Sequence, residues 1–361
     1  MVGVLFAFAV VFFLAVTGLS HVYHAQQESL GKRWFTRGST ELTAGRFGNS
    51  VSDFRAALLY ARDDYSYQLN LAEALIGLKR TGEAQAYLIN LWERQPENGF
   101  VNLELARICA QKGETDKALR YYHNAIYATW PDDQEPERRQ TRLELIDFLL
   151  KINARAQAQS ELIGLAANLG NHPSEQVEVG NLFVRAKDYE NAFNAFQMAL
   201  KSDRHNVDAM AGAGLATFEL GRYALGERYL KQAVAANPHD VESATRLKTT
   251  ELVLRMDPFQ RGLSDAQKNQ IVVDAFAAAG QRLKSCSMEN ASGEGAQPSL
   301  AETWQRMKPR ITASGLRRYP DLVETTMDLV FRIERETDAS CGAPSETDTA
   351  LLLVAKLHEG S

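Results

Sequence analysis

The chain has 361 residues, of which 24% are charged and 45% hydrophobic, and its formal net charge is −5. This ordinary apolar content excludes a disordered or low-complexity chain, and the mildly acidic balance lacks the basic footprint of a nucleic-acid-binding protein. The length allows one long repeat array and a smaller module.

The N-terminal residues 2–19, VGVLFAFAVVFFLAVTGL, contain no charged side chain. As a helix they would extend about 27 Å, just enough to span a thin bilayer. We therefore predict a transmembrane anchor or signal segment over residues 1–20, with membrane contact through residues 2–19. A cleaved secretory signal and a buried N-terminal helix stay open as alternatives, although a signal would need a basic start and a better cleavage site.

A pattern with a period near 34 residues runs from about residue 31 to residue 240. Six small residues mark it, spaced 34, 34, 38, 36 and 34 positions apart: Ser50, Ala84, Ala118, Ala156, Ala192 and Gly226. A second small residue precedes most of them, and apolar residues recur three and four positions apart around both. Such a period predicts a solenoid of paired amphipathic helices, in which each pair buries its apolar face against its neighbours.

These residues resemble the tetratricopeptide repeat (TPR) family. Five of the six units hold the family's register, and its small and aromatic positions in the fifth unit are Gly180, Ala192, Phe196 and Ala199. The fourth unit departs from it, because Glu144 and Ser160 stand where small and aromatic residues are expected. The resemblance implies an all-α fold: a right-handed superhelical solenoid of about six helix pairs over residues 31–240, with a C-terminal helical cap or module.

In TPR arrays the first helix of each unit lines a concave surface, so the resemblance implies a protein or peptide partner bound there. The residues that fall on this surface by register, including three aromatic candidates for apolar anchors, are Phe35, Asn70, Glu73, Phe100, Arg107, Gln111, Asn181, Arg185 and Phe218. One branch of the family grips a chaperone's C-terminal carboxylate with Lys and Asn side chains. Leu69 and Leu103 occupy places where that clamp needs polar groups, so we do not expect it here.

After Asp240 the repeat pattern fades. We predict capping helices over residues 241–286, the second of them opened by a capping box between Ser264 and Gln267. Residues 287–298 are rich in Gly, Ser, Asn and Glu, which is typical of a linker or loop. The remaining helices are expected in a C-terminal helical module over residues 299–361, near 299–308, 320–336 and 346–358.

Two of the three cysteines, Cys286 and Cys341, flank loops of this C-terminal region. They could pair as a disulfide, which would imply an oxidising compartment, or be two unrelated thiols. A disulfide and the N-terminal segment would both favour export. We therefore expect a membrane-anchored protein whose body is periplasmic or otherwise extracytoplasmic.

The sequence contains no Gly-rich phosphate loop, Gly-x-Ser-x-Gly elbow, His-Glu-x-x-His helix or Cys-x-x-Cys pair. We predict no catalytic residue, cofactor site or metal site, and expect a non-enzymatic protein–protein interaction scaffold. A cytoplasmic membrane-anchored adaptor stays open, and so does an enzyme subunit with its chemistry in residues 257–361. For such an enzyme the sequence offers only carboxylates that a solvated helix face explains better, namely Glu324, Asp328, Glu334 and Glu336.

Overall fold

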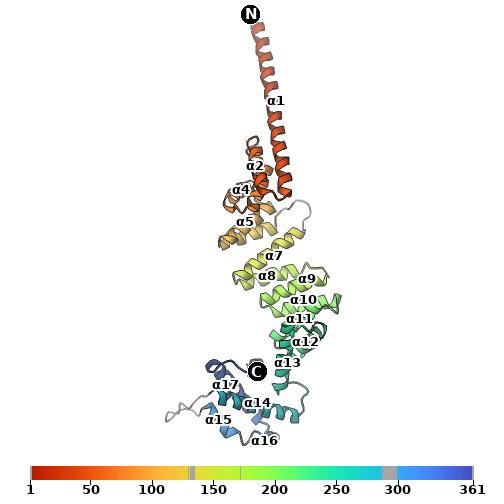
Figure 1. The fold of residues 1–361 in the computed structure, drawn as a ribbon, viewed down its shortest axis with the longest axis vertical. Coiled ribbons are helices and arrows are strands. Elements are labelled where there is room, and N and C mark those ends of the chain that lie inside the picture. The colour runs from red at the N-terminus through yellow and green to blue at the C-terminus, as the bar shows by residue number, and fades with distance from the viewer. Residues whose placement is uncertain (1, 129, 131–134, 171, 287–298, 360–361) are drawn as a thin grey trace. The chain divides into compact units, whose positions relative to one another are not determined.

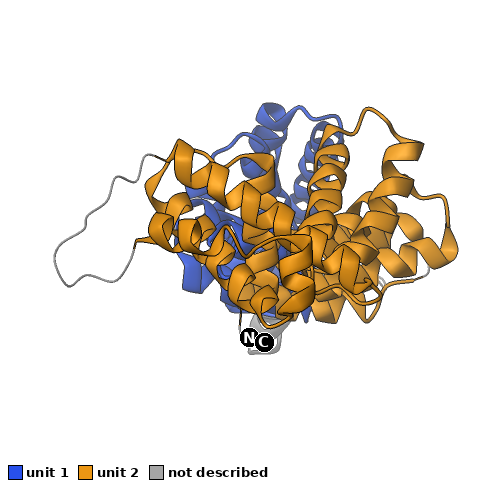
Figure 2. Ribbon diagram, turned by 90° about the horizontal axis from the view of Figure 1, so that it is seen from below, with its two compact units in different colours: residues 1–154 blue, residues 155–361 orange. Residues whose placement is uncertain are grey.

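The computed structural model describes residues 2–128, 130, 135–170, 172–286 and 299–359, and of residues 2–11, 15 and 135 only the backbone. The described residues form α-helices and no strand, as the all-α prediction requires. They divide into two compact units, residues 1–154 and residues 155–361 (Figure 2). The division falls inside the range 31–240 that the sequence pattern predicts as one solenoid, between helix α7 (Glu135–Lys151) and helix α8 (Arg155–Ala166) of the fourth repeat.

Unit 1 consists of helices that follow one another along the chain (Figure 1). They are α1 (Val2–Thr43), α2 (Phe47–Leu58), α3 (Tyr65–Gly77), α4 (Thr81–Arg94), α5 (Gly99–Gln111), α6 (Thr115–Ile126) and α7 (Glu135–Lys151). Each helix contacts the next one along the chain, and the first helices of the first two pairs, α1 and α3, also contact each other. This is the nearest-neighbour packing of a repeat array.

Unit 2 begins with repeat helices of the same kind: α8 (Arg155–Ala166), α9 (Pro173–Arg185), α10 (Tyr189–Ser202), α11 (Val207–Glu219) and α12 (Tyr223–Ala236). It continues with the C-terminal helices α13 (Val241–Met256), α14 (Asp265–Ser285), α15 (Leu300–Met307), α16 (Ala313–Arg318), α17 (Leu322–Ser340) and α18 (Glu346–Leu357). Here α9 and α13 both contact α11, so first helices again lie beside first helices.

The two helices of a pair approach each other at a small residue. In the pair α9/α10, a Cβ atom added at Gly180 would lie 2.7 Å from Cε1 of the fully buried Phe196. Gly38 has the same relation to Phe54 in the pair α1/α2, again at 2.7 Å. Any larger side chain at these glycines would push the helices apart and open the core.

The turn inside each helix pair contains one residue in the left-handed backbone region. These residues are Gly45, Lys79, Gly113, Asn153, Lys187 and Gly221, with φ between 58° and 75°. Three of the six are not glycine, although a side chain disfavours this conformation. The packing of the two helices therefore imposes the left-handed conformation at this turn position, even where the residue is Lys or Asn instead of Gly.

Exchanging residues at two equivalent turns tests this. Lys79→Gly should raise the free energy of unfolding of unit 1 by about 1 kcal/mol, because it relieves the left-handed conformation of a residue with a Cβ. The reciprocal change Gly113→Lys should lower that free energy by a similar amount. Urea unfolding of each variant measures both effects, and shifts in the same direction would contradict the explanation.

Helix α1 joins the predicted N-terminal segment to the first repeat helix without a break. Its N-terminal part projects from the other helices of unit 1 (Figure 1), and Phe13 and Leu19 are 66% and 73% exposed. More than half of the predicted membrane segment 1–20, namely residues 1–11 and 15, lies outside the described side chains. Within the described residues, no helix is both long and apolar enough to cross a membrane.

The C-terminal helices of unit 2 pack around one hydrophobic core. Trp304 of α15 stacks on Phe276 of α14 with ring centroids 5.1 Å apart, and its indole N–H donates to the Phe276 carbonyl oxygen at 2.9 Å. Tyr223 of the last repeat joins the same core. The predicted cap, 241–286, and the predicted module, 299–361, thus share one core, while the predicted linker 287–298 lies outside the described residues.

Two details of this region differ from the predicted helices. The short helix α16 was not expected; Thr312 begins it by accepting a hydrogen bond from the Gly315 backbone N–H at 3.0 Å. Helix α17 extends to Ser340 instead of ending near residue 336, and the buried Thr337 hydroxyl donates to the Ile333 carbonyl oxygen at 2.8 Å.

Cys286 and Cys341, which follow the ends of α14 and α17, form a disulfide with their Cα atoms 5.5 Å apart, a usual separation for such a bond. The buried Arg282 lies beside it and donates to backbone carbonyl oxygens after α17, including that of Gly342 at 2.8 Å. The disulfide and the guanidinium together hold the end of α17 against α14.

Candidate protein-binding surface

The predicted polar site residues of unit 1 lie on two neighbouring first helices. Asn70 and Glu73 lie on α3, and Arg107 and Gln111 on α5. Glu73 and Gln111 are exposed, whereas Asn70 and Arg107 are half-buried. The Asn70 amide donates to the Ser66 carbonyl oxygen of its own helix at 2.9 Å, which leaves its own carbonyl oxygen for a partner.

Arg107 organises this surface. Its guanidinium makes a bidentate contact with Glu144 of α7, with Nε–Oε2 at 2.9 Å and Nη2–Oε1 at 2.6 Å, and also binds Glu104 one turn earlier on α5. Bidentate pairs of this kind are directional as well as strong. The side chain therefore fixes α5 relative to α7 and holds two carboxylates in place.

The group Glu73, Glu104, Arg107 and Glu144, hereafter the Arg107 cluster, carries more negative than positive charge: three carboxylates and one guanidinium. Burial raises the pKa of Glu104, and partial desolvation together with the nearby Glu104 raises that of Glu73. Burial also raises the pKa of Tyr122, which packs beneath the cluster, to about 12. Carboxylates with raised pKa values gain stability when a cation approaches them.

The sequence reasoning missed two members of this cluster. Glu104 has a visible signal, because it precedes Arg107 by three positions on one helix. Glu144 was noted only as a departure from the repeat pattern. Its larger side chain, standing where a small residue is expected, is the one that reaches Arg107.

All three aromatic candidates are half-buried in the structure. Phe35 packs on Phe54 and Tyr67, with ring centroids 5.6 and 4.8 Å apart, and Phe218 packs edge-on to Tyr223 at 5.4 Å. Both are half-buried and pack against other aromatic side chains, so only part of each ring is open to a partner. Phe100 is half-buried in the first turn of α5.

In unit 2, Asn181 and Arg185 lie one turn apart on α9, and both are exposed. Phe218 lies on α11, which contacts α9. Asn181 and Arg185 therefore lie on the first-helix surface of unit 2, just as Asn70 and Glu73 lie on the first-helix surface of unit 1.

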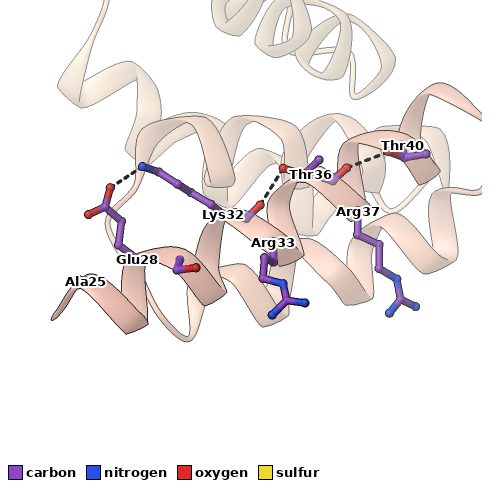
Figure 3. A pocket seen from close by; sticks show the side chains of 8 residues that line it. Ala25, Glu28, Lys32, Arg33, Thr36, Arg37 and Thr40 are labelled. Carbon is purple, nitrogen blue, oxygen red and sulfur yellow. Dashed lines mark hydrogen bonds and ion pairs between the residues drawn. The ribbon is translucent and has the colours of Figure 1, made fainter. Parts of the chain in front are cut away.

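A hollow of about 730 Å³ runs along α1 (Figure 3). Eight residues of this one helix line it, all exposed: Ala25, Glu28, Ser29, Lys32, Arg33, Thr36, Arg37 and Thr40. Lys32 pairs with Glu28 at 2.5 Å, while Arg33 and Arg37 point to the same side of the helix. With no buried residue beneath it, this hollow is a solvated helix face and not an enclosed site.

Family models for tetratricopeptide repeats match residues 35–88 in unit 1 and residues 183–249 in unit 2. The chain carries tetratricopeptide repeats. The two matched ranges hold α2 with α3 and α10 with α11 and α12, and the TPR solenoid agrees with the predicted fold class. No curated protein matches the chain.

Among solved structures, three TPR proteins serve as examples. YrrB, described as a TPR protein with an unusual peptide-binding site, is 16% identical, with a TM-score of 0.42 and coverage of 53% of this chain and 96% of its own. The C-terminal part of a TPR protein from Cytophaga hutchinsonii is 12% identical, with a TM-score of 0.47 and coverage of 67% and 94%. The TPR2AB domain of yeast Sti1 in complex with pHSP90 is 16% identical, with a TM-score of 0.28 and coverage of 68% and 88%.

Replacing Arg107 tests its role on the TPR surface. Arg107→Gln should lower the free energy of unfolding of unit 1 by about 2 kcal/mol at neutral pH, because it leaves the nearly buried Glu104 without its cation. The loss should shrink in acid, where Glu104 becomes protonated. Urea unfolding at neutral and acidic pH measures this.

The matched second variant is Arg107→Gln combined with Glu104→Gln. Because Glu104→Gln removes the carboxylate that Arg107→Gln leaves without its cation, the double variant should recover part of the lost free energy of unfolding at neutral pH. A double variant as unstable as the single one would show that the effect does not come from the carboxylate.

A second polar cluster lies in the C-terminal core and corrects the prediction for Glu334. This residue is 1% exposed, with neither carboxylate oxygen hydrogen-bonded, and does not belong to a solvated face. The cause is packing of its side of α17 against α14 and α18. Burial and the nearby Asp348 raise its pKa to about 8, against the opposing effect of Arg282. Within the described residues, no group of three or more acidic, His or Cys side chains could hold a metal ion.

This carboxyl group makes stability depend on pH. With a pKa of about 8 in the folded chain and 4.5 as its ordinary value, Glu334 stays protonated in the folded state while it ionises in the unfolded one. Its protonated form therefore stabilises the fold at low pH, and that contribution falls between about pH 4.5 and pH 8, by about 1.4 kcal/mol per pH unit at most.

Glu334→Gln should remove this dependence, so that the variant gains stability over the wild type as pH rises. Hydrogen exchange of α17 peptides between pH 5 and pH 8.5, corrected for intrinsic rates, measures the difference. Glu336→Gln, an exposed site on the same helix, is the control. Parallel curves for wild type and Glu334→Gln would contradict the assignment.

Proposed function

We propose that this protein is a non-enzymatic scaffold that binds a protein or peptide partner on the first-helix surface of its TPR units. The Arg107 cluster carries the proposal. Ion pairs hold Glu104, Arg107 and Glu144 in place, and Glu73 lies near Glu104, on the surface that repeat proteins offer to partners.

The charge of the cluster favours a partner segment with a Lys or Arg side chain. The Arg107 guanidinium is shared by the carboxylates of Glu104 and Glu144, Glu73 adds a third negative charge near Glu104, and the pKa values of Glu73 and Glu104 are both raised. A cation from a partner would relieve that repulsion, while Asn70 and Gln111 would supply neutral hydrogen bonds at its sides. Because the ion pairs exist before binding, little side-chain freedom remains to be lost there.

Site-specific photo-crosslinking tests this in cells. A photoreactive residue at Gln111 or Asn70 should capture the same discrete partner, whereas one at Glu93, exposed on the second helix α4, should not. Adding Glu73→Lys should suppress capture at Gln111, while Glu93→Lys should not. Equal capture from Gln111 and Glu93, or no effect of Glu73→Lys, would contradict the proposal.

We further propose that residues 2–19 anchor the protein in a membrane and that its body is extracytoplasmic. The uncharged run and the exposed apolar side chains of α1, such as Phe13 and Leu19, support the anchor. The disulfide between Cys286 and Cys341 supports an oxidising compartment. A cytoplasmic adaptor would instead keep both thiols reduced.

Thiol labelling of denatured protein taken from cells separates the two locations. With Cys109, a buried free cysteine of α5, replaced by serine, Cys286 and Cys341 should react only after a reductant is added. Labelling of both without reductant would favour the cytoplasmic adaptor. The same samples, washed at alkaline pH, should retain the protein in the membrane fraction, and Phe13→Lys combined with Leu14→Lys should release it.

A further inference from the structure

The C-terminal region contains a recess of about 530 Å³ that the proposed scaffold function does not use. It lies between three elements of unit 2: the N-terminal part of α14, the end of α16 and the start of α17. Leu316 and Val323, which are 0% and 6% exposed, line its apolar part. The volume lies within the range of small-molecule sites.

A buried amide lines this recess. Asn269 is 7% exposed, and within the described residues its side chain has no hydrogen-bond partner. Neither of its amide atoms is among the fully buried polar atoms that lack a partner, so the amide is accessible from the recess. A molecule bound in the recess could therefore accept one hydrogen bond from the Asn269 amide nitrogen and donate another to the amide oxygen.

Five charged side chains also line the recess, and none of them forms an ion pair with any described residue. They are Asp265, Lys268, Arg317, Asp321 and Glu324. Two are positive and three negative, a net charge of −1. A ligand with charges of both signs and a small excess of positive charge matches this set better than a simple anion or cation.

We propose that this recess binds a small zwitterion of the basic amino acid class. Its carboxylate would lie against Arg317 and Lys268, and its ammonium groups against Asp265, Asp321 and Glu324. The Asn269 amide would hydrogen-bond the polar backbone of the ligand. The site is independent of the TPR surface, so either proposal can fail without the other.

Calorimetric titration of the full-length protein in detergent tests the site, with L-lysine and L-arginine as probes. At least one should bind at a single site. Arg317→Gln and Glu324→Gln, both at exposed positions, should each weaken binding about tenfold or more, as expected for one charge-assisted contact. Asn269→Ala should abolish it, and Arg318→Gln, beside the recess but not lining it, should leave it unchanged.

Two truncated probes sharpen the assignment. Cadaverine, which is lysine without its carboxylate, should bind more weakly than lysine and should not respond to Arg317→Gln. Inorganic phosphate and L-glutamate should bind more weakly than lysine. Binding of neither basic amino acid, binding unaffected by Arg317→Gln and Glu324→Gln, or equal binding of phosphate would each overturn the proposal.

Discussion

The structure depends on a close approach between the two helices of each repeat. At Gly180 and Gly38 the absence of a Cβ lets a phenylalanine of the second helix fill the crossing completely. That contact fixes the distance between the helices of a pair, and the left-handed turn residue fixes how the chain reverses between them. The orientation of the first helices, and hence of the surface they present, follows from these two constraints.

The same constraint explains how much the sequence predicts. Small residues at a constant spacing are a local signal, so the helix pairs of the repeats and the fold class could be inferred before the structure. The C-terminal helix boundaries rest on weaker signals: the Ser264–Gln267 capping box predicts the start of α14, whereas the short α16 depends on a single Thr312 cap.

The polar clusters were harder to predict because they join residues from distant parts of the chain. Arg107 meets Glu144 across 37 positions, and the register of the fourth unit is shifted by the residues inserted before it. Glu334 looks like a surface residue within its own helix. Only the packing of α14 and α18, which bring Arg282 and Asp348 beside it, makes it a core residue. Such environments are properties of the fold and have no local signature.

The unbroken helix α1 has a mechanical consequence. Residues 2–43 form one rod, so no flexible joint separates the proposed membrane segment from the first helix pair. An α-helix turns by about 100° per residue, so the length of the stretch before Gly31 sets the direction in which the first pair faces around the rod axis. Because no joint absorbs the motion, a rotation or tilt of that pair would be transmitted along the helix to the proposed membrane segment.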